Sequence, residues 1–140
     1  MRLTRASAVI GFVGLAFAGC TSHAAAPSAP FLQGTAWRLD KIGGTTAIPG
    51  VEVTLEFPEE GRIGGRASCN RFFGTVEISG ESIRLGPLAS TKMACIDAAT
   101  SAQETKYLEA LQAAERIAFD GPALVLYSRG NDPPLRFSRK

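Results

Sequence analysis

Histidine, the commonest general base and a frequent zinc ligand, is nearly missing from this sequence, because His23 is the only one among 140 residues. A serine or cysteine nucleophile needs a neighbouring base to activate it, and zinc sites usually combine several histidines and cysteines. The chain also lacks the Gly-x-Ser-x-Gly pattern of the serine-hydrolase nucleophile elbow. We therefore expect a protein that is not an enzyme and that holds no metal or other cofactor.

Long apolar runs are missing as well. The uncharged, largely apolar segment 8–19 follows a start that contains Arg2 and Arg5 and no acidic residue. This segment is shorter than the ~20 residues that a membrane-spanning helix needs. A basic start followed by a short apolar run is typical of a secretory signal peptide. The sequence therefore predicts that residues 1–19 are a signal peptide and that the protein is exported.

The end of this run contains a cysteine motif, Phe17-Ala18-Gly19-Cys20. It resembles the lipobox of bacterial lipoproteins, with Phe17 where that motif usually has an aliphatic residue. The resemblance implies cleavage before Cys20, acylation of the Cys20 sulfur, and attachment to a membrane through lipid. Thr21 stands where an aspartate would retain a lipoprotein in the inner membrane, which implies an outer-membrane location facing the periplasm. The alternative is an ordinary cleavage site beside an unrelated cysteine.

An excess of positive or negative charge is also missing from the exported part. Cleavage after residue 19 removes Arg2 and Arg5 from the 15 basic residues and leaves 13 basic against 13 acidic residues. A neutral chain has no electrostatic footprint for nucleic acid, so we expect no nucleic-acid partner. Residues 20–33 are rich in serine, alanine and proline, which predicts a flexible tether after the lipidated cysteine.

Alternation of apolar and polar residues dominates the chain from residue 34 onward. In the clearest segment, every second residue from Val51 to Phe57 is apolar, which is typical of a half-buried strand. Similar segments separated by turn residues predict eight short strands, at 37–42, 51–57, 62–67, 73–78, 83–85, 117–119, 124–127 and 135–137. With a single helix, this arrangement predicts a mainly β (α+β) fold: a curled antiparallel sheet or small barrel with one helix packed on it.

One stretch has helical periodicity. Ser101 and Glu104 have the spacing of a capping box, which predicts that the helix begins at Ser101. Apolar residues then recur at three- and four-residue steps, which predicts one buried stripe formed by Tyr107, Leu108, Leu111 and Ala114. We expect this helix to end near Arg116.

Cysteine is scarce, and the three present divide between two expected roles. If lipid occupies Cys20, then Cys69 and Cys95 remain as two thiols in an oxidising compartment, where they should form a disulfide if the geometry permits. On the chain-entropy model, a loop of this length contributes about 3.5 kcal/mol of stability.

Five motifs follow one another through the predicted domain. They are Gly34-Thr35-Ala36-Trp37-Arg38-Leu39, Ser68-Cys69-Asn70-Arg71-Phe72-Phe73-Gly74, Leu88-Ala89-Ser90-Thr91-Lys92-Met93-Ala94-Cys95, Glu104-Thr105-Lys106-Tyr107-Leu108-Glu109-Ala110-Leu111 and Leu124-Val125-Leu126. In this order and spacing they resemble the META domain, also called the HslJ family of heat-shock proteins, over residues 34–138. Ser68 is a departure, because the family commonly has glycine there.

The resemblance implies a small β-rich domain of the kind found in bacterial envelope lipoproteins and secreted proteins. Members of the family are linked with heat shock, antibiotic tolerance and, in some parasites, virulence, and no catalytic mechanism is established for them. The expected organisation is a signal peptide at 1–19, a lipidated cysteine and tether at 20–33, and the META domain at 34–138.

Two polar segments near the cysteines form a candidate recognition surface. It consists of Asn70, Arg71, Thr91 and Lys92, braced by the predicted disulfide. Asn70 has a simpler interpretation as a turn-stabilising residue, because asparagine bonds to neighbouring amides. Trp37 is expected to fill the core at the start of the domain.

The leading functional hypothesis is a non-catalytic envelope lipoprotein that supports stress resistance through binding or a structural role. Its membrane contact is the N-terminal lipid, and its further partner is an envelope protein or a small ligand. The alternatives are an inhibitor of an incoming hydrolase, such as lysozyme or a protease, and a carrier of a small apolar ligand in a hollow barrel.

Overall fold

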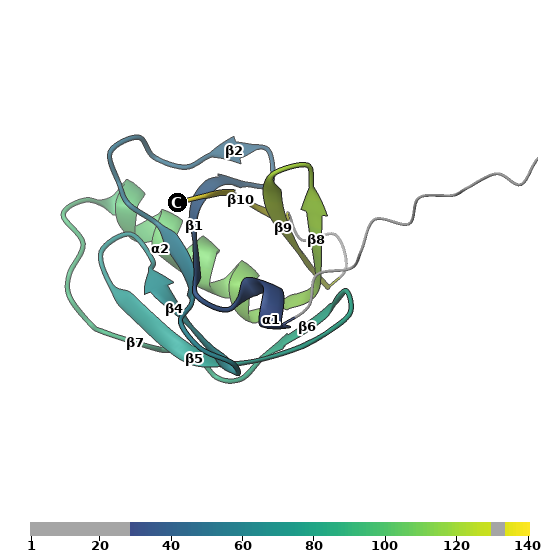
Figure 1. Cartoon of the computed structure of the whole chain (residues 1–140). Helices are drawn as coiled ribbons and strands as arrows, with labels where there is room; N and C mark the ends of the chain where they lie inside the picture. The colour runs from purple at the N-terminus through teal and green to yellow at the C-terminus, as the bar shows by residue number, and fades with distance from the viewer. Residues whose placement is uncertain (1–28, 130–133) are drawn as a thin grey trace, which may run out of the picture.

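The computed structural model of this chain describes residues 29–129 and 134–140. In these residues one antiparallel sheet curls into a barrel and one long helix packs on it, which confirms the predicted fold class (Figure 1). The predicted signal peptide, Cys20 and residues 21–28 of the predicted tether lie outside the described residues. No helix in the described ranges has both the length and the apolar character needed to cross a membrane.

Within the described ranges ten strands form the sheet, and eight of them make the closed ring. In order around the ring they are β1 (Thr35–Ile42), β3 (Thr54–Phe57), β4 (Arg62–Arg66), β5 (Arg71–Ser79), β6 (Ser82–Leu85), β8 (Ala114–Asp120), β9 (Ala123–Ser128) and β10 (Leu135–Arg139). Pairing of β10 with β1, from Trp37 opposite Arg139 to Ile42 opposite Leu135, closes the ring. These eight correspond to the eight predicted strands. The other two strands, β2 (Thr45–Thr46) and β7 (Ala89–Ser90), are two residues long, too short to show any alternation.

The predicted alternation sets which side chains face the barrel interior. In β3 and the residue before it, Val53, Leu55 and Phe57 are buried in the core, as expected. Trp37 is 2% exposed, which confirms its place in the core, and its Nε1–H donates to Thr35 Oγ1 at 2.8 Å.

The helix α2 (Ala98–Gln112) crosses behind the ring in the view of Figure 1. Its buried side chains, which include Tyr107 and Leu111, belong to the core. The Tyr107 ring lies 5.8 Å from that of Phe72 on β5 and 6.3 Å from that of Phe137 on β10. All three side chains are buried, and the Tyr107 hydroxyl donates to the Thr54 carbonyl at 3.0 Å. The described interior is therefore filled by side chains, which leaves the hollow-barrel carrier without support.

Both predicted ends of this helix are wrong. Asp97 is the N-cap, because its side chain accepts the Thr100 N–H at 2.8 Å, so Ser101 lies inside the helix. The capping-box spacing was misleading because Glu104 makes its bonds to another part of the chain. The helix ends at Gln112 instead of near Arg116, because Ala114 already belongs to β8 and pairs with Ser128 of β9. In the predicted stripe, Tyr107 and Leu111 are buried and Leu108 is half-buried, whereas Ala114 is buried but belongs to the strand.

The predicted boundary between tether and domain also needs a correction. Residues Ala29–Leu32 form the short helix α1, and Leu32 is fully buried in the core. The Leu32 carbonyl accepts the Thr35 hydroxyl at 2.6 Å. Burial of an apolar side chain orders the segment that bears it, so the folded domain begins before residue 34.

Candidate functional site

The structure contains the disulfide between Cys69 and Cys95. The Cα atoms of the two cysteines are 5.5 Å apart, and Cys95 follows Cys69 by 26 positions in the sequence. The bond ties the loop that precedes α2 to the residues that lead into β5. It therefore braces the region in which the sequence predicted a recognition surface.

Glu104 on α2 is the centre of this region. Its Oε2 accepts the backbone N–H groups of Cys69 and Asn70 at 2.9 and 2.8 Å, and its Oε1 accepts the Asn70 side-chain amide at 2.6 Å. Hydrogen bonds to a carboxylate are stronger than those between neutral groups. This role of Glu104 could not be recognised in the sequence, because the spacing to Ser101 indicates a local cap and no local pattern marks a partner 34 residues away.

Asn70 uses all of its side-chain hydrogen-bonding capacity within the protein. Its amide nitrogen donates to Met93 O at 3.1 Å as well as to Glu104, and its oxygen accepts the Met93 N–H at 2.7 Å and the Thr91 hydroxyl at 2.8 Å. The residue is 5% exposed. Asn70 and Thr91 thus hold the loop onto the barrel, in agreement with the interpretation of Asn70 as a turn-stabilising residue.

The structure brings the four predicted recognition residues together but divides their roles. Arg71 and Lys92 are exposed beside the buried Asn70. The Arg71 backbone N–H donates to Thr91 Oγ1 at 3.1 Å, and the Thr91 N–H donates to the Arg71 carbonyl at 3.0 Å. Two side chains therefore build the support, and two cations are presented to solvent.

Ser68, the departure from the family pattern, has a φ of 114°. Backbone with φ in this range favours glycine, because a Cβ crowds the neighbouring carbonyl groups. The Ser68 hydroxyl accepts the Gln103 side-chain amide at 3.1 Å, and Gln103 Oε1 accepts the Ile48 N–H at 2.7 Å. The serine thus adds a buried polar contact at a position where its backbone is strained.

The ligating atoms of Cys69, Cys95 and Glu104 lie within 4.8 Å of one another, close enough in principle to surround a metal ion. The two sulfur atoms are bonded to each other, however, and the carboxylate oxygens accept the three N–H bonds described above. In the disulfide-bonded state these three residues stabilise the fold, and the two cysteines offer no thiolate ligand to a metal.

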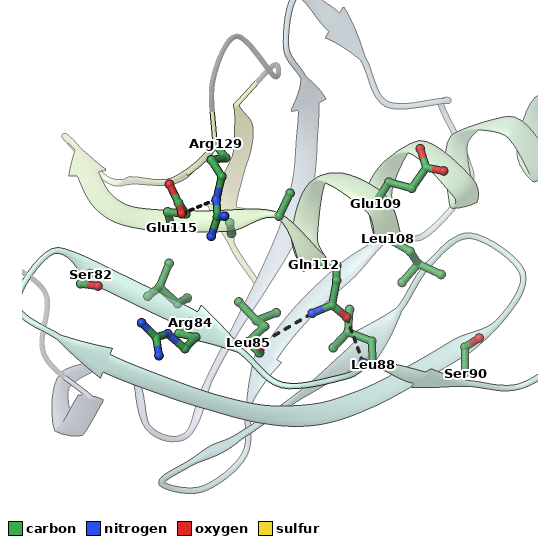
Figure 2. A pocket seen from close by; sticks show the side chains of 13 residues that line it. Ser82, Arg84, Leu85, Leu88, Ser90, Leu108, Glu109, Gln112, Glu115 and Arg129 are labelled. Carbon is green, nitrogen blue, oxygen red and sulfur yellow. Dashed lines mark hydrogen bonds and ion pairs between the residues drawn. The ribbon is translucent and has the colours of Figure 1, made fainter.

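A cleft opens where β6 and β8 separate. In the described residues these strands pair at one position, Ser82 with Arg116. The C-terminal end of α2 lies beside the gap (Figure 2). The cleft there has a volume of about 840 Å³, and we call it the seam cleft.

Gln112 holds the inner wall of the seam cleft. Its Oε1 accepts the Leu88 N–H at 3.0 Å, and its Nε2 donates to Leu85 O at 3.4 Å (Figure 2). The same Nε2 also donates to Gly86 O at 3.0 Å. These bonds satisfy backbone groups that have left the regular sheet pairing. The side chain therefore spans the seam that β6 and β8 leave open.

The lining of the seam cleft combines apolar and polar groups. Its apolar side chains are buried or half-buried and include Ile83, Leu85, Leu88 and Leu108. The polar side chains include an ion pair between Glu115 and Arg129, together with Ser82, Arg84, Ser90 and Glu109. Such a lining is typical of a site that binds an apolar group and orients it through polar contacts.

A second groove of about 680 Å³ lies between α2 and the β1–β2 turn. Its lining includes Ile42, Ile48, Ala102 and Ala110, with Lys106 as a cation. Gln103 crosses this groove to bond the Ile48 N–H. The groove is thus an apolar crevice between two packed elements.

Comparison with known proteins identifies the family. The model of the META domain family matches residues 30–140, and the chain belongs to this family. No curated protein matches the chain.

Solved structures share the fold. An NMR structure of a protein from Burkholderia xenovorans is 27% identical, with a TM-score of 0.64 over 87% of this chain and 97% of its own. Another NMR structure is 21% identical, with a TM-score of 0.66 over 80% of this chain and 94% of its own. A crystal structure of a DUF4847 family protein from Bacteroides vulgatus is 15% identical, with a TM-score of 0.54 over 78% and 94% of the two chains. The family and these neighbours give no sign of catalysis.

Proposed function

We propose that this protein is a non-catalytic lipoprotein anchored at the outer membrane and facing the periplasm. Its META domain would support tolerance of envelope stress or antibiotics by binding a partner or small ligand. The observation that carries this proposal is the seam cleft, whose wall is held by the side-chain bonds of Gln112 and whose lining suits binding.

Complementation of a gene deletion tests the binding role. We expect the deletion to raise sensitivity to heat and to envelope-active antibiotics, and the wild-type gene to restore resistance. Ser82→Trp places a bulky ring in the seam cleft from an exposed position on β6 and should fail to restore resistance. Ser101→Trp, at an exposed position of α2 outside both clefts, is the matched control and should restore it. Equal restoration by both variants would exclude the seam cleft as the site.

The lipid anchor has its own test. Intact-mass analysis of the native protein should find acyl groups on an N-terminus that begins at Cys20, and Cys20→Ser should move the protein from the membrane fraction to the soluble fraction. A full-length product without acyl mass would contradict the anchor and the outer-membrane location.

A second function, inhibition of an incoming hydrolase, is favoured by the loop at residues 91–97. The disulfide and Asn70 brace this loop, yet Met93 is 64% and Ile96 99% exposed. A rigid loop with exposed apolar side chains is a suitable form for entering an enzyme cleft. The test is inhibition of lysozyme or a periplasmic protease at micromolar concentration, and Ile96→Asp should abolish it.

A small apolar ligand remains a candidate occupant, but the filled barrel interior directs it to the outside of the barrel. Native mass spectrometry of the purified protein would detect such a ligand, and Ser82→Trp should release it from the seam cleft.

A further inference from the structure

Two arginines face each other on the outer side of the barrel. Arg66 on β4 and Arg71 on β5 are direct cross-strand partners, and both are exposed. Their neighbours Ile63 and Phe72 point into the core, so the arginines belong to the outward face of their strands. Like charges directly opposite each other on a sheet are destabilising. This pair therefore lowers the stability of the fold, and packing in the core does not account for its presence.

The neighbouring acidic residue does not neutralise this pair. Glu52 forms an ion pair with Lys140, and this contact is the main reason that the pKa of Glu52 is lowered, with smaller contributions from Arg66 and Arg71. One carboxylate is therefore shared among three cations. Lys92 adds a further exposed cation beside Asn70. In the described residues, no ion pair involves the side chain of Arg66, Arg71 or Lys92.

Large apolar side chains are exposed beside these cations. Phe73 lies two residues from Arg71 on the same face of β5 and is 61% exposed. Its cross-strand partners are Gly64 on β4 and Ala89 on β7, neither of which is large enough to cover the ring. Met93 and Ile96, on the braced loop next to Asn70, are 64% and 99% exposed.

The loop is fixed to the barrel at several points beside Arg71, which places its exposed residues next to those of β4 and β5. Thr91 bonds the Arg71 backbone, Met93 bonds Asn70 through its N–H and carbonyl, and Cys95 is bonded to Cys69. We call this surface the docking face and define it as Arg66, Arg71, Phe73, Lys92, Met93 and Ile96. None of these six residues lines the seam cleft or the second groove.

We propose that the docking face contacts the surface of a bilayer that contains anionic phospholipid. The arginines and lysine would bind lipid phosphates, and the apolar side chains would enter the boundary between headgroups and acyl chains. The combination matches the requirement for interfacial binding, which sums buried apolar area and attraction of basic residues to anionic lipid. The cations lie on the outer face of the barrel, outside both clefts. Several cations on an open surface suit contact with an extended membrane better than contact with one acidic side chain of a partner protein. The biological setting rests on the proposed envelope location, and the contact would hold the tethered domain against its membrane.

Vesicle co-sedimentation tests this contact without the lipid anchor. The core residues that the structure describes run from Leu32 to Phe137, so the chain from residue 21 onward contains all of them and omits both Cys20 and the apolar segment 8–19. We expect it to bind vesicles of phosphatidylcholine and phosphatidylglycerol in equal parts, not vesicles of phosphatidylcholine alone. Binding should weaken as salt is raised, because salt screens exposed charges.

Paired variants separate the docking face from bulk charge. Arg66→Gln with Arg71→Gln should lower the partition coefficient about thirtyfold, and Phe73→Ser alone about tenfold. The matched control is Arg116→Gln with Arg136→Gln, which removes the same charge from β8 and β10 and should leave binding unchanged. All variants are at exposed or half-exposed positions, so we expect them to fold like the wild type. An unchanged circular dichroism spectrum would verify this.

Three results would overturn the docking proposal: no binding to anionic vesicles, equal loss of binding in the control, or inhibition of a hydrolase through the loop without vesicle binding. The proposed seam-cleft function is judged separately. Ser82→Trp should bind vesicles like the wild type even if it fails to restore resistance, so the failure of either proposal is visible by itself.

Discussion

Glu104 binds Asn70 at two atoms, accepting its backbone N–H at 2.8 Å and its side-chain amide at 2.6 Å. The two residues lie on α2 and just before β5. Asn70 in turn binds the loop ahead of α2 through the Met93 N–H and the Thr91 hydroxyl. A buried polar network of this kind stabilises one arrangement only when each member is satisfied. Here it fixes the support beneath the docking face.

Glu104→Gln should destabilise the protein by about 2 kcal/mol, because it directs an amide donor at groups that also donate. Denaturant unfolding measures the change as a lower midpoint with an unchanged slope. Glu109→Gln, on an exposed part of the same helix, is the control and should stay within about 0.5 kcal/mol of the wild type. Equal stability of the two variants would contradict a structural role for the Glu104 carboxylate.

Ser68→Gly and Ser68→Ala both remove the hydroxyl that accepts from Gln103, and they differ only in the backbone freedom of the new residue. Because φ at this position is 114°, the glycine variant should be more stable than the alanine variant by about 1–2 kcal/mol. Thermal and denaturant unfolding of the two proteins would measure this difference. An alanine variant as stable as the glycine variant would show that the backbone here is unstrained.

Replacement of Cys69 and Cys95 by alanine should lower the free energy of unfolding by about 3.5 kcal/mol, because the unfolded chain regains the freedom of the closed loop. Addition of a reductant to the wild type should produce a similar loss and should leave the double variant unaffected. A wild type that is insensitive to reductant under unfolding conditions would argue against the disulfide as a source of stability.

Asp97 gives the stability a pH dependence. The backbone N–H and the hydroxyl of Thr100 both donate to its carboxylate, and they lower its pKa below its ordinary value of 3.8. A pKa that is lower in the folded state means that the stabilisation is present above pH 3.8 and is lost as pH falls through the folded-state value. Asp97→Asn should therefore unfold at a lower temperature than the wild type at neutral pH, and the gap should close at acidic pH. A gap that stays constant across this range would contradict the role of the ionised cap.

Strand positions were predictable from the sequence because their signal is local. A strand has a period of two residues, so the apolar positions at Val53, Leu55 and Phe57 indicate one buried face whichever strand lies beside it. The stripe that contains Tyr107 and Leu111 indicates the helix for the same reason. The helix ends were harder to predict, because Ser101 and Glu104 satisfy the capping pattern while Glu104 bonds residues on the far side of a loop.

By itself, then, the sequence determined the number of ring strands, the presence of the one long helix, the buried faces and the availability of two cysteines for a disulfide. Tertiary structure alone decided the closure of β10 onto β1, the seam between β6 and β8 that Gln112 spans, and the meeting of Arg66, Phe73 and the braced loop on one surface. Periodicity records only what a residue's near neighbours require. These other features depend on pairings between residues far apart in the chain, whose partners are selected when the whole core packs.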